Sequence, residues 1–324
     1  MLKDRFNEVI SKFKSKKILV IGDLMLDSYL IGQSNRISPE APVPIIEVNK
    51  VEHNLGGAAN VALNLSSLGC KVSLVGLIGD DPEGQVFRAL LDKSNIDFTS
   101  LVESENRPTT VKSRIISHDQ QVIRTDREIT FDLSDESNNE LITIASSVIE
   151  NVDAVILEDY NKGVLNPLSI SKIINIAKKL NKPIYVDPKV KNFDLYKNVR
   201  LFKPNLSEFR TFCKENTSLR KDGFELKKNL NADILMVTRS AEGVSLFVDT
   251  DYHDIPTKAR KVHDVSGAGD TVIATFTLSD LSGATPEESV VLSNFAAGRV
   301  CEELGVVPIS LAMLNEMIEH HNNL

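Results

Sequence analysis

The sequence predicts an α/β fold: a mainly parallel central sheet with helices on both faces and a small β lid. The first observation is that, from residue 134 onward, short apolar runs typical of buried strands alternate with amphipathic stretches typical of helices. This alternation predicts β-α-β units with parallel strands. The second is that a polar residue follows strand after strand, which predicts a ligand cleft at the carboxyl edge of the sheet. These residues are Asp23, Asp159, Asp187, Asn205 and Thr238.

Bulk composition narrows the class of protein. The chain has 324 residues, of which 42% are hydrophobic and 25% charged, as in ordinary globular proteins. Its net charge of −8 argues against nucleic acid or an anionic membrane surface as the main partner. The three cysteines lack disulfide or zinc spacing, and no secretory leader is evident, so we expect a cytoplasmic protein. No linker divides the chain, and one domain over residues 1–324 is expected.

The first third of the chain predicts part of the main sheet and an inserted flap. An amphipathic helix is expected over 1–17 and a buried strand over 18–22. Three prolines in residues 34–44 exclude a helix or a central strand there, so residues 34–50 are expected to form a flap outside the main sheet. A helix is expected to open at Asn54 and run to Leu68, followed by one strand over 72–79 and a helix over 82–94.

Residues 109–127 predict a hairpin with one basic face. Both arms alternate apolar and polar residues, and Lys112, Arg114 and Arg124 share a face. Two readings stay open for this face. It is either a solvated sheet surface or part of a lid that meets a phosphate already present on a substrate.

The second half of the chain continues the β-α-β alternation. Strands are expected over 154–158, 184–186, 201–202, 234–237 and 244–248, and helices over 135–150, 168–180, 271–281, 286–304 and 310–320. Asn205 is expected to cap a further helix, with Glu208 completing a capping box. Oxygen atoms at a helix start also suit Mg²⁺ that keeps its water, and both roles can hold together.

The most informative stretch is Val265-Ser266-Gly267-Ala268-Gly269-Asp270-Thr271. Small residues before a helix let consecutive N–H groups point at one anion, and the positive end of the helix favours charge that develops there. A carboxylate beside such an anion hole is suited to take a proton from an attacking hydroxyl, so Asp270 is the candidate base. The alternative is a glycine-rich turn with Asp270 as a helix cap.

Further polar residues are candidates for ligand contact. Asp23, Asp27 and Asn60 carry side chains that hydrogen-bond sugar hydroxyls, and Gly57 allows close approach to the backbone. The turn holding Thr238 and Gly243 is a candidate for nucleotide phosphates, and Asn294 for a wall of an adenine pocket. For each residue the alternative is an ordinary turn, cap or solvated surface. Arg36 either faces an anionic substrate group or is merely solvated.

Two of these motifs resemble those of the ribokinase-like (PfkB) carbohydrate kinases, in the same order over nearly the whole chain. They are Gly56-Gly57-Ala58-Ala59-Asn60 and residues 264–271. Within that family the likeness is greatest to the kinases of D-glycero-β-D-manno-heptose 7-phosphate. It is carried by residues 22–27, 34–44, 159–163, 187–189, 203–208 and 237–240.

The resemblance implies ATP-dependent phosphorylation of the anomeric hydroxyl of heptose 7-phosphate, for ADP-heptose and lipopolysaccharide core synthesis. It implies Asp270 as base and Gly267, Ala268 and Gly269 as anion hole. Asn205 and Glu208 would organise Mg²⁺, mainly through water. Asp23, Asp27, Gly57 and Asn60 would hold the sugar. Asp159 and Lys162 are further candidates for substrate contact. Arg36 and the hairpin cations Lys112, Arg114 and Arg124 are our own candidates for the 7-phosphate.

The resemblance carries three further expectations. Many relatives append a nucleotidyltransferase domain, but this sequence has no H-x-G-H motif, so only the kinase step is expected. Relatives often pair their lid strands between subunits, so a homodimer is expected. The alternatives are a kinase for another sugar, such as fructose or ribose, and a non-catalytic sugar or nucleotide sensor. A P-loop nucleotidase is disfavoured because no G-x-x-x-x-G-K-[ST] occurs.

Overall fold

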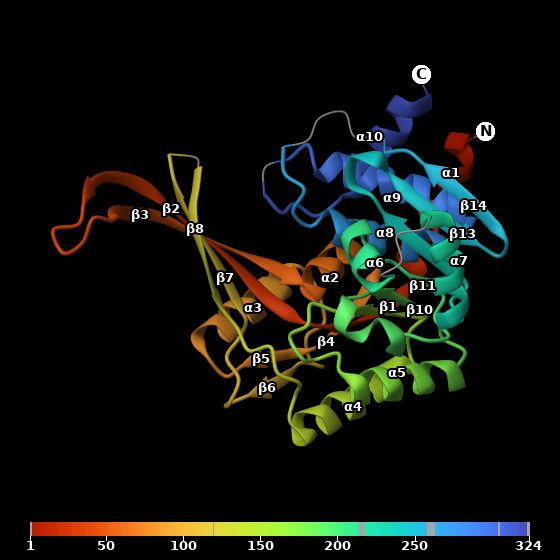
Figure 1. The fold of residues 1–324 in the computed structure, drawn as a ribbon, viewed down its shortest axis with the longest axis horizontal. Helices are drawn as coiled ribbons and strands as arrows, with labels where there is room; N and C mark the ends of the chain where they lie inside the picture. The colour runs from red at the N-terminus through yellow and green to blue at the C-terminus, as the bar shows by residue number, and fades with distance from the viewer. Residues whose placement is uncertain (1, 119, 214–217, 258–262, 304, 323–324) are drawn as a thin grey trace.

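The computed structural model describes residues 2–118, 120–213, 218–257, 263–303 and 305–322. The architecture has three parts: a large sheet, helices on its two faces, and a β lid that projects from the body (Figure 1). Asp119, in the turn of the predicted hairpin, lies outside the described residues. The predicted α/β class and the lid are both confirmed.

The central sheet has the strand order β14-β13-β12-β11-β10-β9-β1-β4. Within this sheet, the neighbouring strands β12, β11, β10, β9, β1 and β4 all run parallel. The sheet is antiparallel only where β12 pairs with β13 and β13 with β14. Its parallel strands are almost continuously apolar because both faces are covered. The bounds are β1 Lys17–Gly22, β4 Lys71–Val75, β9 Ala154–Glu158, β10 Ile184–Asp187, β11 Leu201–Phe202, β12 Ile234–Thr238, β13 Val244–Val248 and β14 Asp251–Ile255.

Two hydrophobic cores lie on the two faces of this sheet. Alternate residues of β1 show the division: Ile18 and Val20 enter one core, while Leu19 and Ile21 enter the other. The first core is completed by α1 (Leu2–Ser11), α2 (Ala58–Ser67), α3 (Pro82–Lys93), α8 (Ala268–Leu281), α9 (Pro286–Val300) and α10 (Leu311–Asn322). The second is completed by α4 (Asp135–Ile149), α5 (Pro167–Lys179), α6 (Leu206–Phe212) and α7 (Leu219–Leu230).

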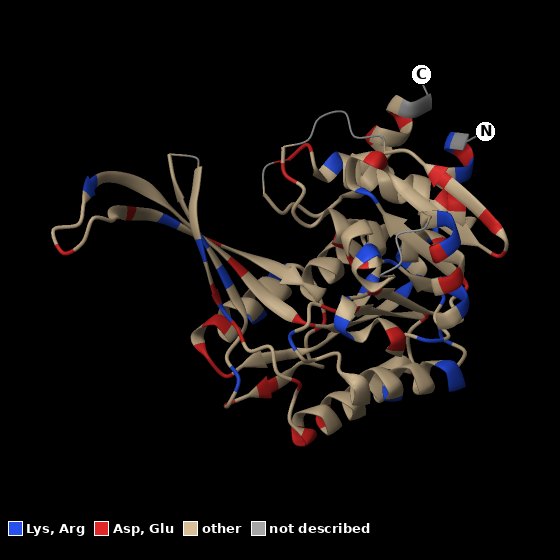
Figure 2. Cartoon of the chain, viewed as in Figure 1, with Lys and Arg blue, Asp and Glu red and all other residues tan. Residues whose placement is uncertain are grey.

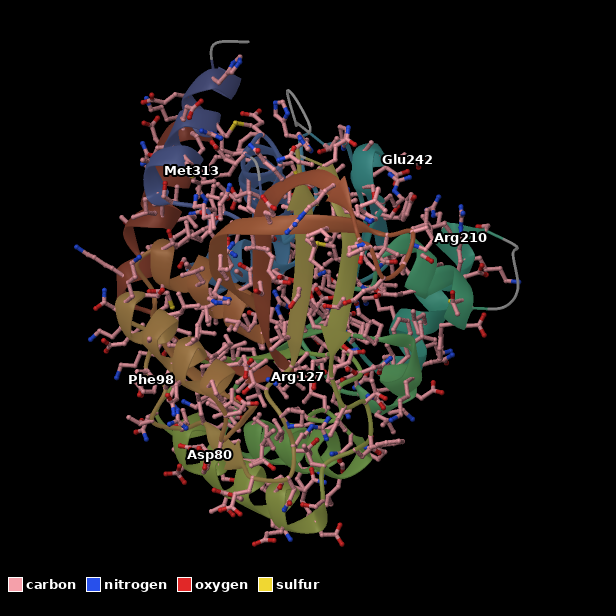
Figure 3. The ribbon with its side chains drawn as sticks, turned by 90° about the vertical axis from the view of Figure 1, so that its left-hand side faces the viewer. Asp80, Phe98, Arg127, Arg210, Glu242 and Met313 are labelled. Atoms are coloured by element: carbon pink, nitrogen blue, oxygen red, sulfur yellow. The ribbon has the colours of Figure 1, made fainter. Side chains whose placement is uncertain are left out.

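The lid is a four-stranded sheet in the order β3-β2-β7-β8. Its strands are β2 (Leu24–Ile37), β3 (Pro44–Gly57), β7 (Val111–Ser117) and β8 (Gln120–Arg127). Arg127, at the foot of β8 in Figure 3, donates to Glu83 at 2.7 Å and to Asp81 at 3.1 Å, which ties the lid to the start of α3. Both charge signs occur on the lid strands (Figure 2).

Pairing in register gives the lid one charged and one apolar face. The row Glu52, Tyr29, Arg114 and Arg124 crosses all four strands on one face. The adjacent row, on the other face, is Val51, Leu30, Ile115 and Ile123. Lys112, Arg114 and Arg124 share a face, as predicted, but Asp27, Glu52 and Asp126 lie on the same face. The face is therefore mixed in charge and not simply basic.

Several predicted boundaries are wrong. The helices expected over 1–17 and 286–304 end at Ser11 and Val300, and three further boundaries differ for physical reasons. The flap begins well before residue 34, because β2 and β3 pair along their whole length and the prolines are confined to their tip. Residues 54–57 belong to β3, and the helix starts at Ala58. The predicted strand over 72–79 is two strands, β4 and β5 (Leu77–Gly79), the latter paired with β6 (Val102–Ser104). Gly76 lies between β4 and β5, and a Cβ there would lie 2.7 Å from the Gly22 carbonyl oxygen, so the close approach to the end of β1 requires a glycine at this position.

The sheet places the predicted cleft residues at one edge. Asp23 follows β1, Asp159 follows β9, Asp187 ends β10 and Thr238 ends β12. The start of α8 meets the same edge, because Asp270 contacts residues from α2 and from the loop after β9. In the described part of the chain, no helix combines the length and apolar character needed to cross a bilayer.

Candidate active site

Asp270 lies in the first turn of α8 with its side chain buried. Only 5% of the residue is exposed, and both carboxylate oxygens accept hydrogen bonds. The Asn60 amide nitrogen donates to Oδ2 at 2.7 Å, and the Tyr160 hydroxyl donates to Oδ1 at 3.0 Å. The predicted base and the predicted sugar ligand Asn60 are thus direct neighbours, although 210 residues separate them in sequence.

Buried polar side chains hold α2 and α8 together behind the base. The Asn64 amide nitrogen donates to the Asn60 carbonyl oxygen at 2.8 Å, and the Thr271 hydroxyl donates to Asn64 Oδ1 at 3.1 Å. These contacts satisfy polar groups that would otherwise be costly to bury. They also fix the distance between the two helix starts, and therefore the position of Asp270.

The glycine loop before α8 has the conformation that an anion hole requires. Gly267 caps the helix with φ of +79°, and a Cβ there would lie 2.8 Å from Asn60 Nδ2. The Ala268 N–H donates back to the Val265 carbonyl at 3.2 Å, so it belongs to the turn itself. The Gly267, Gly269 and Asp270 N–H groups have no acceptor among the described residues, as expected around a first helical turn. These three amides are available to an anion.

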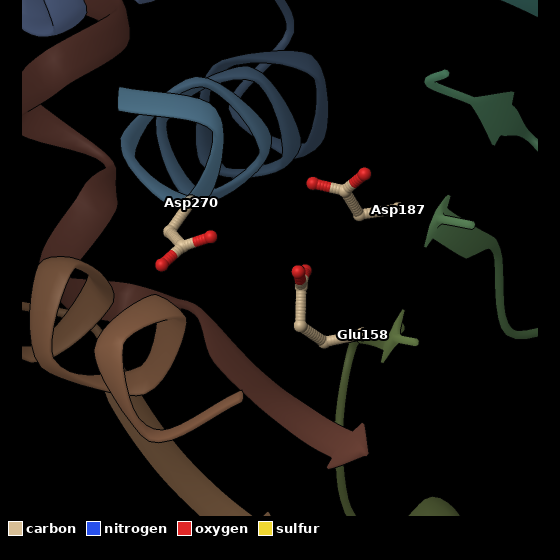
Figure 4. Close-up of side chains that lie close together, drawn as sticks. All are labelled: Glu158, Asp187 and Asp270. Carbon is tan, nitrogen blue, oxygen red and sulfur yellow. The ribbon is translucent and has the colours of Figure 1, made fainter. Parts of the chain in front are cut away.

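A cluster of three buried carboxyl groups surrounds this point (Figure 4). Oxygens of Glu158, Asp187 and Asp270 all lie within 4.8 Å of one another. Lys203, which is only 2% exposed, balances part of this charge through an ion pair of 2.6 Å with Asp187. Glu158 Oε2 is buried and has no hydrogen-bond partner within the described residues.

Burial and mutual repulsion alter the protonation of these groups. Burial, supported by repulsion from Asp187, raises the pKa of Asp270 to about 6, although the hydrogen bonds from Asn60 and Tyr160 lower it. Burial and the neighbouring Asp187 and Asp270 carboxylates hold the pKa of Glu158 well above its usual range. A base with a pKa near 6 is ionised at neutral pH and accepts a proton more readily than an ordinary aspartate.

Asn205 and Glu208 form the predicted capping box at the start of α6. Each side chain accepts from the backbone N–H of the other at 2.9 Å, and Lys189 also pairs with Glu208. Thr238 lies beside this box, because it forms a bridge with Asn205. The oxygens fit Mg²⁺ that keeps its water and takes its direct ligands from nucleotide phosphates. The carboxyl cluster fits a cation less well, since both Asp270 oxygens accept hydrogen bonds and Asp187 is paired with Lys203.

Asp23 and Asp159 turn inward and hold the loop after β9. Asp23 accepts backbone N–H bonds from Tyr160, Lys162 and Val164 at 2.8, 2.9 and 3.1 Å. Asp159 accepts from Asn192, Tyr196 and the Asn161 N–H. Both carboxylates are therefore committed to protein groups. Burial, with repulsion from Asp159, raises the pKa of Asp23 to about 6.

The cationic side chains that were predicted to meet the substrate lie in two places, some near Tyr160 and one near the tip of the lid. Lys112 Nζ lies 5.4 Å from the centre of the Tyr160 ring, and Lys162 pairs with Glu128 at 2.7 Å. Arg114 is held by Asp27 at 2.5 Å, and both side chains are largely buried. Arg36 is 65% exposed near the tip of the β2–β3 ribbon and pairs with Glu47, so the structure does not bring it to the others.

Gly57, Gly243 and Asn294 occupy constrained positions. A Cβ at Gly57 would lie 2.4 Å from the Asp23 carbonyl oxygen, which explains the glycine where β3 turns into α2. Gly243 packs against Ile255 and Pro256, and Asn294 donates to the Pro256 carbonyl at 3.3 Å. Gly243 and Asn294 thus both lie against Pro256, directly after β14.

Sequence reasoning missed three residues at the centre of the site: Glu158, Tyr160 and Lys203. A signal was present for Glu158, since it is an acid closing an otherwise apolar strand. Lys203 similarly follows the short strand β11 directly. Nothing local marks Tyr160, because its contact with Asp270 spans 110 residues.

Comparison with known proteins shows a family and a fold that this chain resembles. Residues 15–311 match the pfkB family of carbohydrate kinases. The chain is 42% identical over 313 residues to the bifunctional protein HldE of Haemophilus influenzae (strain PittEE), covering 95% of this chain and 64% of that protein. It is also 42% identical over 300 residues to HldE of Helicobacter pylori (strain G27), covering 91% and 65%. The chain thus spans a little under two thirds of the length of these relatives.

Solved structures share the fold at low sequence identity. Arabidopsis thaliana ribokinase complexed with ribose and ATP has a TM-score of 0.72 and 18% identity, covering 94% of this chain and 99% of that one. Phosphofructokinase-2 from Escherichia coli, in complex with fructose-6-phosphate, has a TM-score of 0.77 with the same identity and coverage.

Proposed function

Since the chain belongs to the pfkB family of carbohydrate kinases, we propose that it uses ATP to phosphorylate the anomeric hydroxyl of D-glycero-D-manno-heptose 7-phosphate. The product is the 1,7-bisphosphate, which feeds ADP-heptose and lipopolysaccharide core synthesis. The observation that carries the kinase chemistry is the buried Asp270 carboxylate beside the free amides of α8. The choice of heptose is supported by the motifs that resemble heptose 7-phosphate kinases and by the 42% identity to HldE.

In the proposed reaction, Asp270 removes the proton from the sugar hydroxyl as its oxygen attacks the γ-phosphorus in line. The Gly267, Gly269 and Asp270 amides stabilise the negative charge that develops on the transferred group. A Cβ placed at Gly269 would lie 3.7 Å from Lys203 Nζ, so this ammonium also faces the anion hole. The Lys203 ammonium group therefore also stabilises the negative charge on the transferred phosphoryl group.

Asn205 and Glu208 are the proposed residues for Mg²⁺, through its water shell. The metal, when bound, neutralises charge on the nucleotide phosphates. Lys189 keeps Glu208 in place through their ion pair. Thr238, Gly243 and Asn294 are proposed to accommodate the nucleotide.

The charged face of the lid supports a phosphorylated substrate. Lys112 is the lid cation linked to the base, because it lies 5.4 Å from the centre of the Tyr160 ring, whose hydroxyl donates to Asp270. Lys162 belongs to the same loop as Tyr160, two residues further along the chain. Burial lowers the pKa of Lys112, so an arriving phosphate would restore a counter-charge to it. Arg114 would share its charge between Asp27 and the ligand. Lid closure over the sugar would exclude water and limit ATP hydrolysis.

The proposed homodimer is supported by the uncovered face of the lid. Among described residues, six of the eleven exposed large apolar side chains lie on the lid, including Val51 and Ile123, each 53% exposed. Exposed apolar surface of this extent is typical of an interaction site. A second copy of the chain, with the same apolar row, is a self-complementary partner.

A coupled ADP-release assay tests the function. ATP and Mg²⁺ would be supplied with heptose 7-phosphate, free heptose, fructose, fructose 6-phosphate and ribose. We expect turnover with heptose 7-phosphate well above that with the other sugars. Preference for an unphosphorylated hexose would instead identify another sugar kinase, and no sugar-dependent ADP would favour a sensor.

The matched control is Asp270→Asn, which keeps the shape of the side chain and removes the base. We expect kcat to fall by about 10²–10⁴-fold, while the KM of the sugar changes little. Near-normal turnover in this variant would refute the assignment of the base.

A further inference from the structure

We propose that Tyr160 is a positioning residue that holds the Asp270 carboxylate and links it to the lid. The inference rests on the proposed function, in which Asp270 is the base. Tyr160 contacts four separate parts of the chain: Asp23, Asp270, Lys112 and Lys189. No other side chain described here joins the base, the lid and the loop after β10.

The backbone of Tyr160 is fixed by a hydrogen bond to the buried Asp23 carboxylate. Its N–H donates to Asp23 Oδ2 at 2.8 Å. The backbone N–H groups of Lys162 and Val164 also donate to the Asp23 carboxylate. Since Asp23 is 1% exposed, these bonds lie away from water and hold the loop firmly. The ring therefore leaves the sheet edge from a defined point.

The hydroxyl of Tyr160 determines how the base is presented. It donates to Oδ1 of Asp270 at 3.0 Å, while Asn60 donates to Oδ2 at 2.7 Å. Two donors on the two oxygens fix the plane of the carboxylate, which orients the remaining lone pairs for a sugar hydroxyl. Without the Tyr160 donor, only the Asn60 hydrogen bond would restrain rotation of the carboxylate about its Cβ–Cγ bond.

The same hydroxyl stabilises the ionised base against its surroundings. The charged groups that face Asp270 are Glu158 at the end of β9, Asp187 at the end of β10 and Lys203 after β11. Burial and Asp187 raise its pKa, while Asn60, Tyr160 and Lys203 lower it. Loss of the Tyr160 hydrogen bond removes one of the stabilising contributions, so the pKa of Asp270 should rise.

The ring of Tyr160 has a second contact that the hydroxyl does not share. Lys112 Nζ from the lid and Lys189 Nζ lie 5.4 and 5.1 Å from its centre, within the range of cation–π attraction. Lys189 also pairs with Glu208 of the capping box. Removal of the hydroxyl and removal of the ring should therefore have different consequences.

The first test compares Tyr160→Phe with the wild type across pH. We expect kcat to fall about tenfold, the equivalent of one lost hydrogen bond to a charged group, with the sugar KM nearly unchanged. The acidic limb of kcat/KM should move to higher pH by about one unit. Tyr160→Leu should also raise the sugar KM, because Lys112 then loses its support.

Tyr185→Phe is the matched control. The Tyr185 hydroxyl donates at 2.6 Å to Asp280, a carboxylate on the same helix α8 but at its far end. Arg200 still pairs with Asp280 in that variant. We expect reduced stability with an unchanged pH profile. If Tyr160→Phe also leaves the acidic limb and kcat unchanged, the inference is overturned while the proposed function stands.

A second readout needs no turnover. The free energy of unfolding is measured in urea for the Asp270→Asn variant and for its parent, the same chain with Asp270 intact. The pH dependence of the difference between the two reports the pKa of Asp270. Because this pKa is raised on folding, the parent loses stability relative to the Asn variant as pH rises from 3.8 to about 6. In a Tyr160→Phe background this window should extend to higher pH. An unchanged window refutes the inference even if the wild type phosphorylates none of the sugars.

Discussion

At the scale of single residues, the site depends on acids that are buried with incomplete charge balance. Glu158, Asp187 and Asp270 are 1%, 7% and 5% exposed, and Lys203 is the cation paired within this cluster. Water cannot solvate these carboxylates, so their protonation is determined by neighbouring side chains. A pH dependence of the reaction therefore follows from the fold itself.

The first residue-scale prediction concerns that pH dependence. Asp270 must be ionised to accept a proton, and its pKa is raised to about 6. Activity should therefore be full near pH 8 and be lost as pH falls through about 6. The measurement is kcat/KM for the sugar between pH 5 and 9, with the coupling enzymes in excess at each pH. An acidic limb near pH 4 would show that the base is more solvated than this structure has it.

At the scale of elements, the lid combines two sheet faces with different tasks. The face that carries Arg114 is charged and has Lys112 near the base, whereas the opposite face carries the apolar row. A strand alternates its side chains between faces, so one ribbon can meet a polar ligand and an apolar partner at once. The buried ion pair of Asp27 and Arg114 joins β2 to β7 at the charged face.

The element-scale prediction is that Arg114→Met raises the KM for the phosphorylated sugar about tenfold, with the KM for ATP nearly unchanged. The reason is that the guanidinium is proposed to share its charge between Asp27 and the sugar phosphate. Steady-state kinetics with each substrate varied in turn measures both constants.

Arg36→Met is the comparison for Arg114→Met, because Arg36 is an exposed lid arginine paired with Glu47 near the ribbon tip. We expect a smaller change in KM from this variant. Equal effects of the two substitutions, or an equal rise in the KM for ATP, would contradict a specific phosphate contact at Arg114. Thermal unfolding of both variants separates loss of binding from loss of the buried pair.

At the scale of the whole molecule, the body and the lid differ in how they are stabilised. The body has two cores, one on each face of the sheet. The lid packs one end against the body and leaves Val51 and Ile123 exposed. A sheet with an uncovered apolar face is typical of an interaction site.

The whole-molecule prediction is that the protein is a dimer and that Val51→Lys with Ile123→Lys makes it a monomer. Two ammonium groups in the apolar row would be desolvated on association and would repel their copies. Size-exclusion chromatography with light scattering gives the mass of each. Circular dichroism of the double variant should show an unchanged fold. If the wild type remains monomeric at high concentration, the proposed dimer is wrong.

Much of the fold could be predicted because its signals are local. The apolar runs of β1, β9 and β12 and the caps of α3 and α6 are complete within a few residues. The strands of the lid were harder to predict. β2 and β3 gain their length from pairing with each other, and residues 54–57 read as a helix start until that pairing is known.

The candidate site was predicted unevenly for the same reason. The glycine loop and Asp270 form a contiguous motif, so sequence alone could mark them. For Asp23 and Asp159, the residue types were noticed but their partners were not, because those partners are backbone N–H groups and side chains of other segments. Arg36 shows the converse, since its charge indicated a ligand contact but the ribbon carries it away from the cleft.

By itself the sequence determined the α/β class, the polar edge of the sheet, the loop before α8 and the family likeness, because each is a pattern of neighbouring residues. Only the tertiary structure decided that Asn60 and Tyr160 hold the two oxygens of Asp270, that Glu158 and Asp187 lie beside it, and that Asp23 supports a loop. The physical reason is that burial and charge balance depend on segments brought together by folding, and no single stretch of chain contains them.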